Sequence, residues 1–227
     1  MGYEGLSECF ASWVAHHTNI KEFAPITDYY MCDIVEDSNV FTGCYSKNFL
    51  NPGETCLTIG RLLALEKGNT DRQMQRLSTN DRIKTVVDTV IEVTGITNFG
   101  EWLTALLEFD SLILNEDRHT HNIAVIETSN GKYKLMPLFD NGAAFCADTN
   151  KDYPLSKPVD ICIRNTKAKP FNSDFKKQVS ACRELYGSQL RVELTANDIS
   201  TGLLDEFHMY SDLVRRRVLY ILRNRLL

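Results

Sequence analysis

The sequence lacks the features that would identify an exported or membrane-bound protein. No run approaches the roughly 18 apolar residues of a membrane-spanning helix, and the first residues, MGYEGLSECF, are acidic, unlike a signal peptide. The seven cysteines form no Cys-x-x-Cys pair, and an odd number does not suit a disulfide framework. These absences favour a cytoplasmic protein with reduced thiols and no membrane association.

An excess of basic charge is also missing. The 25 Lys and Arg residues against 30 Asp and Glu give a formal net charge of -5, so we expect no direct nucleic-acid binding. The one basic stretch, RRRVLYILRNR at 215–225, is expected to lie on the solvent-exposed outer face of a last helix. With 227 residues, 43% of them hydrophobic, the chain is long enough for one large domain or two small lobes around a buried core.

The first half of the chain has clear secondary-structure signals. Apolar residues recur at intervals of three and four along 3–17, which predicts a helix. Segments 25–37 and 39–46 are rich in β-branched and aromatic residues and predict a hairpin around a polar Asp-Ser turn. Three helices are expected next, at 54–68 with Gly68 as a C-cap, at 78–95 and at 99–115. The last is apolar on nearly every side, as in a central buried helix.

The second half opens with a hairpin signal, two strand-like segments at 122–128 and 132–140 joined by Ser-Asn-Gly. The polar segment 148–172 has no strong period and is predicted to be a long ordered loop. Helices are expected again at 173–187 and over 195–227. We find no internal repeat, low-complexity tract or linker.

Two short motifs carry the chemistry, LNEDRHTHNIAVIE at 114–127 and LFDNG at 138–142. Asp117 and Asn122 are five apart, directly after a buried helix, and a hairpin then brings Asp140 back towards them. Phosphoryl transfer uses this layout, in which an Asp accepts the hydroxyl proton while an Asn and a second Asp hold metal ions against the phosphates. The alternative is that the three side chains only close turns, as Asx residues commonly do.

Other polar residues of the first motif are weaker candidates. His119 and His121 suggest a zinc site, but no third His or Cys follows at a fitting spacing. Glu116 is expected to be solvated or paired with a neighbour rather than catalytic.

NEDRHTHNIAVIE followed by PLFDNG resembles the catalytic and metal-binding loops of the HipA-like serine/threonine kinases, in particular the branch that contains the Helicobacter cell-translocating kinase A. It is similar, more remotely, to the D-R-H-x-x-N and D-F-G loops of phosphoinositide kinases. EFDSLILN, GYEGLSE at 2–8 and FTGCYSKNFLNPGE at 41–54 resemble the same branch. The resemblance implies an α+β, mainly helical, protein-kinase-like fold that binds ATP and Mg²⁺.

Site roles follow from the resemblance where the motif matches. Asp117 would be the catalytic base, and Asn122 and Asp140 would bind magnesium and thereby the nucleotide. Arg118 and His119 would orient the loop or contact phosphate, with hydrogen bonding inside the loop as the alternative. Glu8, or else Glu4, would pair with a phosphate-binding lysine, unless both lie on a solvated helix face.

The chain departs from such a kinase in its first part. It contains no Gly-x-Gly-x-x-Gly loop, and no strand lysine precedes the first helix. We therefore expect a remnant of an N-lobe and hinge at 1–50 and a helical C-lobe at 51–227. The departure fits a fragment, a kinase completed by a small N-lobe partner, or a degenerate kinase.

Three functions remain open on the sequence. The first is a HipA-like kinase core that transfers the γ-phosphoryl group of ATP to Ser or Thr of a protein, weakly or not at all as this chain alone. The second is an inactive pseudokinase or interaction module of a toxin–antitoxin-like system, with an antitoxin-like partner. The third is phosphorylation of a small molecule or lipid.

Overall fold

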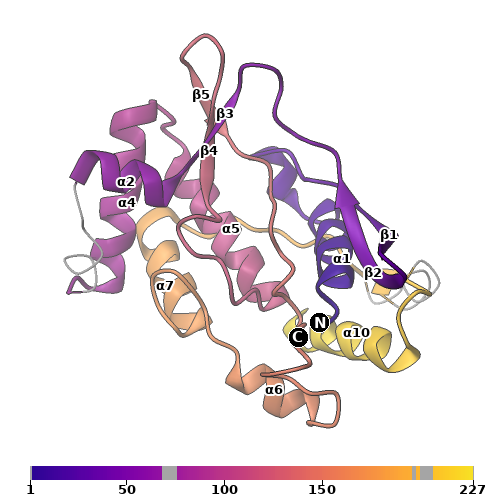
Figure 1. Cartoon of the computed structure of the whole chain (residues 1–227). Helices are drawn as coiled ribbons and strands as arrows, with labels where there is room; N and C mark the ends of the chain where they lie inside the picture. The colour runs from indigo at the N-terminus through magenta and orange to yellow at the C-terminus, as the bar shows by residue number, and fades with distance from the viewer. Residues whose placement is uncertain (1, 68–75, 196–197, 200–206, 227) are drawn as a thin grey trace.

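The computed structural model describes residues 2–67, 76–195, 198–199 and 207–226. Helix α5 (Phe99–Ile113) runs through the middle of the molecule, as Figure 1 shows. Helix α1 (Glu4–His16) and a β-hairpin lie on one side of it, and α2 (Ile59–Lys67) and α4 (Thr79–Thr94) lie on the other. Helices predominate and the sheets are small, which confirms the predicted α+β, mainly helical fold.

The first hairpin forms as predicted. Strands β1 (Tyr29–Glu36) and β2 (Asn39–Ser46) pair antiparallel, and the left-handed backbone of Asp37 (φ 54°) closes the turn. The first arm begins at residue 29 rather than 25 because the preceding residues pair elsewhere. The amide of Thr27 donates to Leu138 O at 3.1 Å, which ties this segment to the chain leaving the second hairpin.

The second hairpin is also confirmed, but its second arm, expected at 132–140, is a strand only over Tyr133–Leu135, and a third strand that the sequence did not indicate joins it. Strands β4 (Ala124–Glu127) and β5 (Tyr133–Leu135) form the hairpin, and β3 (Thr55–Thr58) pairs with the other edge of β4. The helix expected over 54–68 therefore begins only at Ile59. Alternating residues in TCLT suit a strand, and the free edge of β4 supplies the hydrogen bonds that a helical turn would otherwise have made.

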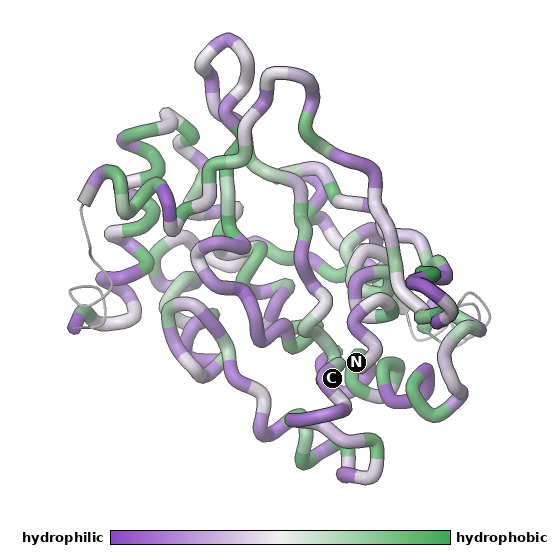
Figure 2. The backbone as a smooth tube through the Cα atoms, viewed as in Figure 1, coloured by the Kyte–Doolittle hydropathy of each residue, from purple (hydrophilic) through white to green (hydrophobic). Residues whose placement is uncertain are grey.

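Helix α4 shows local capping in agreement with the sequence. The Ser78 hydroxyl accepts from the amide of Asp81, and Gly95 ends the helix in the left-handed region (φ 72°). The apolar stripe of α4 is buried, and its outer face is polar. Figure 2 shows this alternation of hydrophobic and hydrophilic residues along the outer helices.

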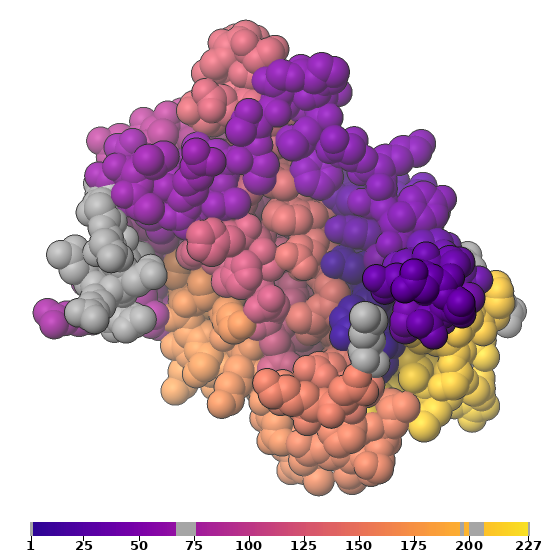
Figure 3. Space-filling view, viewed as in Figure 1, coloured from indigo at the N-terminus to yellow at the C-terminus, as the bar shows by residue number. Residues whose placement is uncertain are grey.

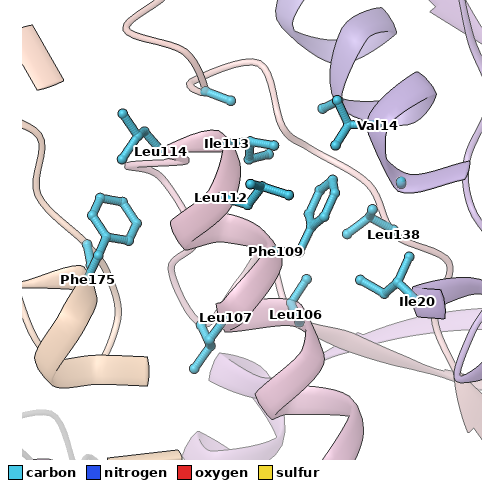
Figure 4. Close-up of a cluster of buried hydrophobic side chains, with 14 of the residues drawn as sticks. Val14, Ile20, Leu106, Leu107, Phe109, Leu112, Ile113, Leu114, Leu138 and Phe175 are labelled. Carbon is cyan, nitrogen blue, oxygen red and sulfur yellow. The ribbon is translucent and has the colours of Figure 1, made fainter. Parts of the chain in front are cut away.

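Helix α5 forms the centre of the core. In Figure 4 its side chains Phe109 and Ile113 lie on the side where Val14 of α1 and Leu138 are found, while Phe175 lies on the other side of the helix. Almost every residue of α5 is buried, as its apolar sequence predicts. Two acidic residues, Glu108 and Asp110, are buried with them, and both need internal partners.

The segment 148–172 is not a plain loop. It contains a short helix, α6 (Val159–Asn165), which begins directly after Pro158. Pro158 is its N-cap, with a non-helical ψ of 132°, and the carbonyl oxygen of Pro158 accepts from the amides of Ile161 and Cys162. Seven residues are too few to show a helical period in the sequence. The region around α6 projects at the bottom of the view in Figure 3.

The last elements are α7 (Phe175–Tyr186), capped by the carboxylate of Asp174, and α10 (Asp212–Leu226). The helix expected over 195–227 is therefore not continuous, since residues 198–199 are helical, residues 207–209 form a turn and α10 begins only at Asp212. Its expected course through 196–197 and 200–206, and the C-cap expected at Gly68, lie outside the described residues.

The basic stretch at 215–225 is only partly solvated, contrary to expectation. Arg217 is buried and donates to the carbonyl oxygens of Tyr153 and Pro154. Arg225 donates to the backbone and hydroxyl of Ser111 on α5. These arginines therefore attach the last helix to the rest of the chain.

All seven cysteines are free thiols. In the part of the chain that the structure describes, no helix has the length and apolarity needed to cross a membrane.

Candidate functional site

The loop between α5 and β4 and the turn after β5 meet at Arg118, a side chain that is almost completely buried. Its Nε and Nη2 atoms donate to the two carboxylate oxygens of Asp110 at 2.9 and 3.1 Å. This bidentate ion pair attaches the loop to α5. Burial raises the pKa of the Asp110 carboxyl, and the Arg118 guanidinium beside it opposes that shift.

Arg118 uses its remaining donors to hold the two motifs together. Nη1 donates to the carbonyl oxygens of Asn122 at 3.0 Å and Phe139 at 2.8 Å, and Nη2 donates to Oδ1 of Asn141 at 2.6 Å. With the two bonds to Asp110, all five donors of the guanidinium are occupied. Of the roles left open for Arg118, loop orientation fits this geometry, because no donor remains for a phosphate.

Asn115 is a second buried connector. Its amide nitrogen donates to Oδ1 of Asp110 at 3.0 Å and lies 3.5 Å from the carbonyl oxygen of Asp140. Its side-chain oxygen accepts from the amide of Asp117 at 3.2 Å. The backbone of both candidate acidic residues is thereby fixed to the same buried side chains.

Asp117 lies at the surface of this network, with 45% of its side chain exposed. Its Oδ1 accepts a hydrogen bond from Nζ of Lys169 at 2.7 Å. Its Oδ2 lies 3.8 Å from Nε2 of His119, which is beyond hydrogen-bond distance. One carboxylate oxygen of Asp117 is thus engaged, and the other is available to accept a proton.

Asn122 is buried beneath Asp117, and its orientation is fixed. Its Nδ2 donates to the carbonyl oxygen of Asp117 at 3.0 Å. The side-chain oxygen Oδ1 has no protein donor among the hydrogen bonds of the described residues. A carbonyl-type oxygen held in this way is a suitable ligand for a hard cation.

Asp140 has a half-buried carboxylate and a left-handed backbone (φ 57°), an uncommon conformation for a residue other than glycine. Burial raises the pKa of this carboxyl, the charge of Asp117 adds to the shift, and Arg118 and His119 oppose it. The carboxylate accepts no protein hydrogen bond that the structure describes. A magnesium ion would offset both the cost of burying the negative charge of Asp140 and the repulsion from Asp117, so Asp140 and Asn122 fit that metal.

Magnesium is usually held by one or two protein ligands together with phosphate oxygens and water. Within the described ranges, no group of three or more His, Cys, Asp and Glu side chains is arranged to hold a metal ion. His119 and His121 lie with their rings 5.8 Å apart, and the buried Nδ1 of His119 has no hydrogen-bond partner among the described residues.

Glu8 contacts the second motif, but with a partner that the sequence did not indicate. Its two carboxylate oxygens accept from the amide of Asn141, and Oε1 also accepts from the amide of Gly142, each at 2.9 Å. Burial raises the pKa of Glu8 to about 7. Glu4 lies near the end of the chain, where it accepts from the amide of Gly2. In the described part, no lysine lies within ion-pair distance of Glu8.

Glu116 is paired, one of the two outcomes expected for it. Its Oε1 accepts from the amide of Lys167 at 2.7 Å, and its side chain also bonds to Tyr153. The segment 148–172 is thereby attached to the first motif.

Four residues of the site were missed from the sequence. For Asp110 and Asn115 a signal existed, because a carboxylate and an amide at the end of an otherwise apolar helix need buried partners. Asn141 follows Asp140 directly in the LFDNG motif, but the sequence assigns no role to it. Lys169 had no sequence signal, because its contact with Asp117 joins positions 52 residues apart.

Comparison with known proteins supports the kinase character of the fold. No protein-family model matches the chain, and no curated protein matches it. Among solved structures, that of the Helicobacter pylori proinflammatory kinase CtkA is similar, with a TM-score of 0.62 over 98% of this chain and 78% of that chain. The sequence identity is 16%, so the likeness concerns the fold. The chain therefore has a kinase-like fold.

Proposed function

We propose that this chain is the core of a HipA-like protein kinase, which transfers the γ-phosphoryl group of ATP to a Ser or Thr hydroxyl of a protein. The observation that supports the proposal is the Arg118 network, in which the guanidinium binds the backbone of Asn122 and of Phe139, next to Asp140, while Asn122 Nδ2 binds the backbone of Asp117. Among the described residues, Oδ2 of Asp117, Oδ1 of Asn122 and the Asp140 carboxylate accept no protein hydrogen bond. Residues 1–50 would correspond to part of an N-lobe and hinge, and 51–227 to a C-lobe.

The chemistry assigned to the chain is mainly positioning. Oδ2 of Asp117 accepts the proton of the acceptor hydroxyl as the oxygen attacks the γ-phosphorus. A new oxygen–phosphorus bond forms, the bond between the γ-phosphorus and the β,γ-bridging oxygen breaks, and ADP leaves with that electron pair. Asn122 and Asp140 would hold magnesium, which would supply positive charge to the phosphate oxygens.

The acceptor is proposed to be a protein hydroxyl on the strength of the family resemblance. The same loops would also suit a small molecule or lipid hydroxyl. The phosphate-incorporation assay therefore includes protein and non-protein acceptors.

A second candidate is a pseudokinase or interaction module of a toxin–antitoxin-like system. It is favoured by Glu8, whose carboxylate binds the backbone of the Asn141–Gly142 turn and contacts no lysine in the described part of the chain. Without a lysine on the phosphates, transfer would lose much of its electrostatic stabilisation. For the first candidate the same feature means slow turnover by this chain alone, and faster turnover with an N-lobe partner.

Incorporation of radiolabelled phosphate from γ-labelled ATP and magnesium, under single-turnover conditions, tests the first candidate. Wild type should label itself or a mixed protein acceptor, and Asp140→Asn should lose at least about 100-fold, since a metal ligand is removed without a change of shape. Asp33→Asn, on the exposed part of β1, is the matched control. Labelling that survives in Asp140→Asn would refute the site. Labelling of a lipid acceptor only would refute the protein substrate.

The second candidate predicts a different pattern. Wild type would incorporate no phosphate, and calorimetry with magnesium and a non-hydrolysable ATP analogue would show no binding. Tight binding of the analogue together with phosphate incorporation would exclude a degenerate kinase.

A further inference from the structure

Lys169 contacts the candidate base Asp117 from a distant segment. Its Nζ lies 2.7 Å from Oδ1 of Asp117, and the two side chains are 51% and 45% exposed. Exposed ion pairs of this kind are often accidental, because a lysine side chain is long and mobile. Whether this contact is more than that depends on how firmly the backbone of Lys169 is held.

Gln178 on α7 holds the backbone around Lys169 from below. This side chain is fully buried, and its Nε2 donates to the carbonyl oxygen of Lys169 at 2.9 Å. Its Oε1 accepts from the amides of Phe171 and Asn172 at 2.9 and 3.1 Å. A buried side-chain amide that makes three hydrogen bonds to the backbone of one turn fixes the conformation of that turn.

Two further bonds hold the residues that directly precede Lys169. The amide of Lys167 donates to Glu116, the residue next to Asp117, at 2.7 Å. The amide of Ala168 donates to the carbonyl oxygen of Ser173 at 3.0 Å. The lysine is therefore presented to the first motif by a turn that is fixed to both α7 and the motif itself.

We propose that Lys169 is a positioning residue for the phosphoryl transfer, which rests on the kinase function proposed above. By binding Oδ1 it holds the Asp117 carboxylate in one orientation, so that Oδ2 points to the acceptor hydroxyl and receives its proton. Lys169 acts through Asp117 and takes no proton itself. The buried Gln178 acts indirectly in the same way, since it fixes the backbone of Lys169 and Lys169 in turn orients Asp117.

The test compares Lys169→Met with Lys167→Met in the same single-turnover assay. Lys167 is two residues away in the same turn, and only its backbone contacts Glu116, so its substitution is a matched control. We expect Lys169→Met to lower the rate of transfer about 10- to 100-fold, a part of what a positioned acid–base group supplies, with the KM for ATP unchanged. Lys169→Arg should recover most of the rate, and Lys167→Met should equal wild type.

A double variant separates positioning from a structural effect. In an Asp117→Asn background the Lys169→Met change should cause no further loss, because its partner is already removed. The proposal would be overturned by a Lys169→Met rate equal to or above that of wild type, by an equal loss in Lys167→Met, or by a full further loss in the Asp117→Asn background.

The contact itself can be measured without activity. The ¹⁵N-detected ammonium signal of Lys169 should be visible in the wild type and lost or shifted in Asp117→Asn. A signal that is the same in both proteins would also overturn the proposal. A wild type that transfers no phosphate refutes the kinase function itself, whereas an active wild type with an equally active Lys169→Met variant refutes only the role of Lys169.

Discussion

The Arg118 network and the outer face of the β1–β2 hairpin differ in how firmly their side chains are held. Arg118 has every donor satisfied in the interior by partners from three segments. The hairpin packs one face on α1, while its outer face leaves Tyr30 and Tyr45 about half exposed and its tip leaves Val35 69% exposed. Of these two regions, the candidate site is thus the one whose geometry is fixed by buried hydrogen bonds.

The largest effect should come from breaking that network. Arg118→Met leaves the buried carboxylate of Asp110 without its cation, and removing one partner of a buried ion pair costs about 3–5 kcal/mol. We expect the free energy of unfolding, measured by urea denaturation, to fall by that amount. Arg61→Met, at an exposed position of α2, is the control and should change it by less than about 0.5 kcal/mol. Equal stability of the two variants would contradict the network.

Glu8 gives a pH-dependent effect at the junction of the two regions. Burial raises its pKa from 4.5 to about 7, so the folded state binds a proton that the unfolded state has lost between these values. This contribution is therefore present below about pH 4.5 and is lost as the pH rises to about 7. It is worth on the order of 3 kcal/mol, at 1.36 kcal/mol per pKa unit.

The measurement is the difference in unfolding free energy between wild type and Glu8→Gln from pH 4.5 to 7.5. The glutamine side chain of the variant does not ionise. The unfolding free energy of Glu8→Gln should therefore rise relative to that of the wild type as the pH increases across this range. A difference that is constant with pH would show that the carboxyl is ionised throughout, as its backbone hydrogen bonds favour.

A substitution on the outer face of the β1–β2 hairpin should lower the unfolding free energy much less. Tyr45→Ala removes the ring that lies 5.4 Å from the ring of Tyr30 across the strands. Both rings are partly exposed, so we expect a loss of about 0.5–1.5 kcal/mol in thermal or urea unfolding. A loss as large as that of Arg118→Met would reverse the comparison.

The smallest effect on stability should come from Asp117→Asn, despite a large effect on activity. The side chain is 45% exposed and its ion pair with Lys169 is a surface contact, worth about 0–1 kcal/mol. We expect an unfolding free energy within about 1 kcal/mol of the wild type, and a transfer rate lowered about 100- to 10,000-fold. Destabilisation beyond about 2 kcal/mol would mean that Asp117 serves the fold.

Much of the fold follows from local sequence signals. Ser78 and Gly95 define the ends of α4, and the Asp-Ser and Ser-Asn-Gly turns place the two hairpins, because these residues act within a few positions of themselves. Strand β3 was missed because only its pairing with β4 decides between strand and helix. Helix α6 was missed because it is too short to show a period.

For the site, the sequence indicated Asp117, Asn122 and Asp140 as a group, and their roles remain predictions. What it did not indicate is the set of contacts that arrange them. The bonds from Arg118 to Phe139, and from Lys169 to Asp117, join segments that are far apart in the chain. Such contacts depend on tertiary structure and leave no periodic or local trace.

The central claim is that Asn122 and Asp140 hold a metal ion against the phosphates of a nucleotide beside Asp117. It is tested most directly by water-proton relaxation with Mn²⁺ in place of Mg²⁺ and a non-hydrolysable ATP analogue. We expect analogue-dependent Mn²⁺ binding in the wild type, at least 10-fold weaker binding in Asp140→Asn and Asn122→Ala, and undiminished binding in Asp117→Asn. Binding that is equal in wild type and Asp140→Asn, or that is lost in Asp117→Asn alone, would contradict it.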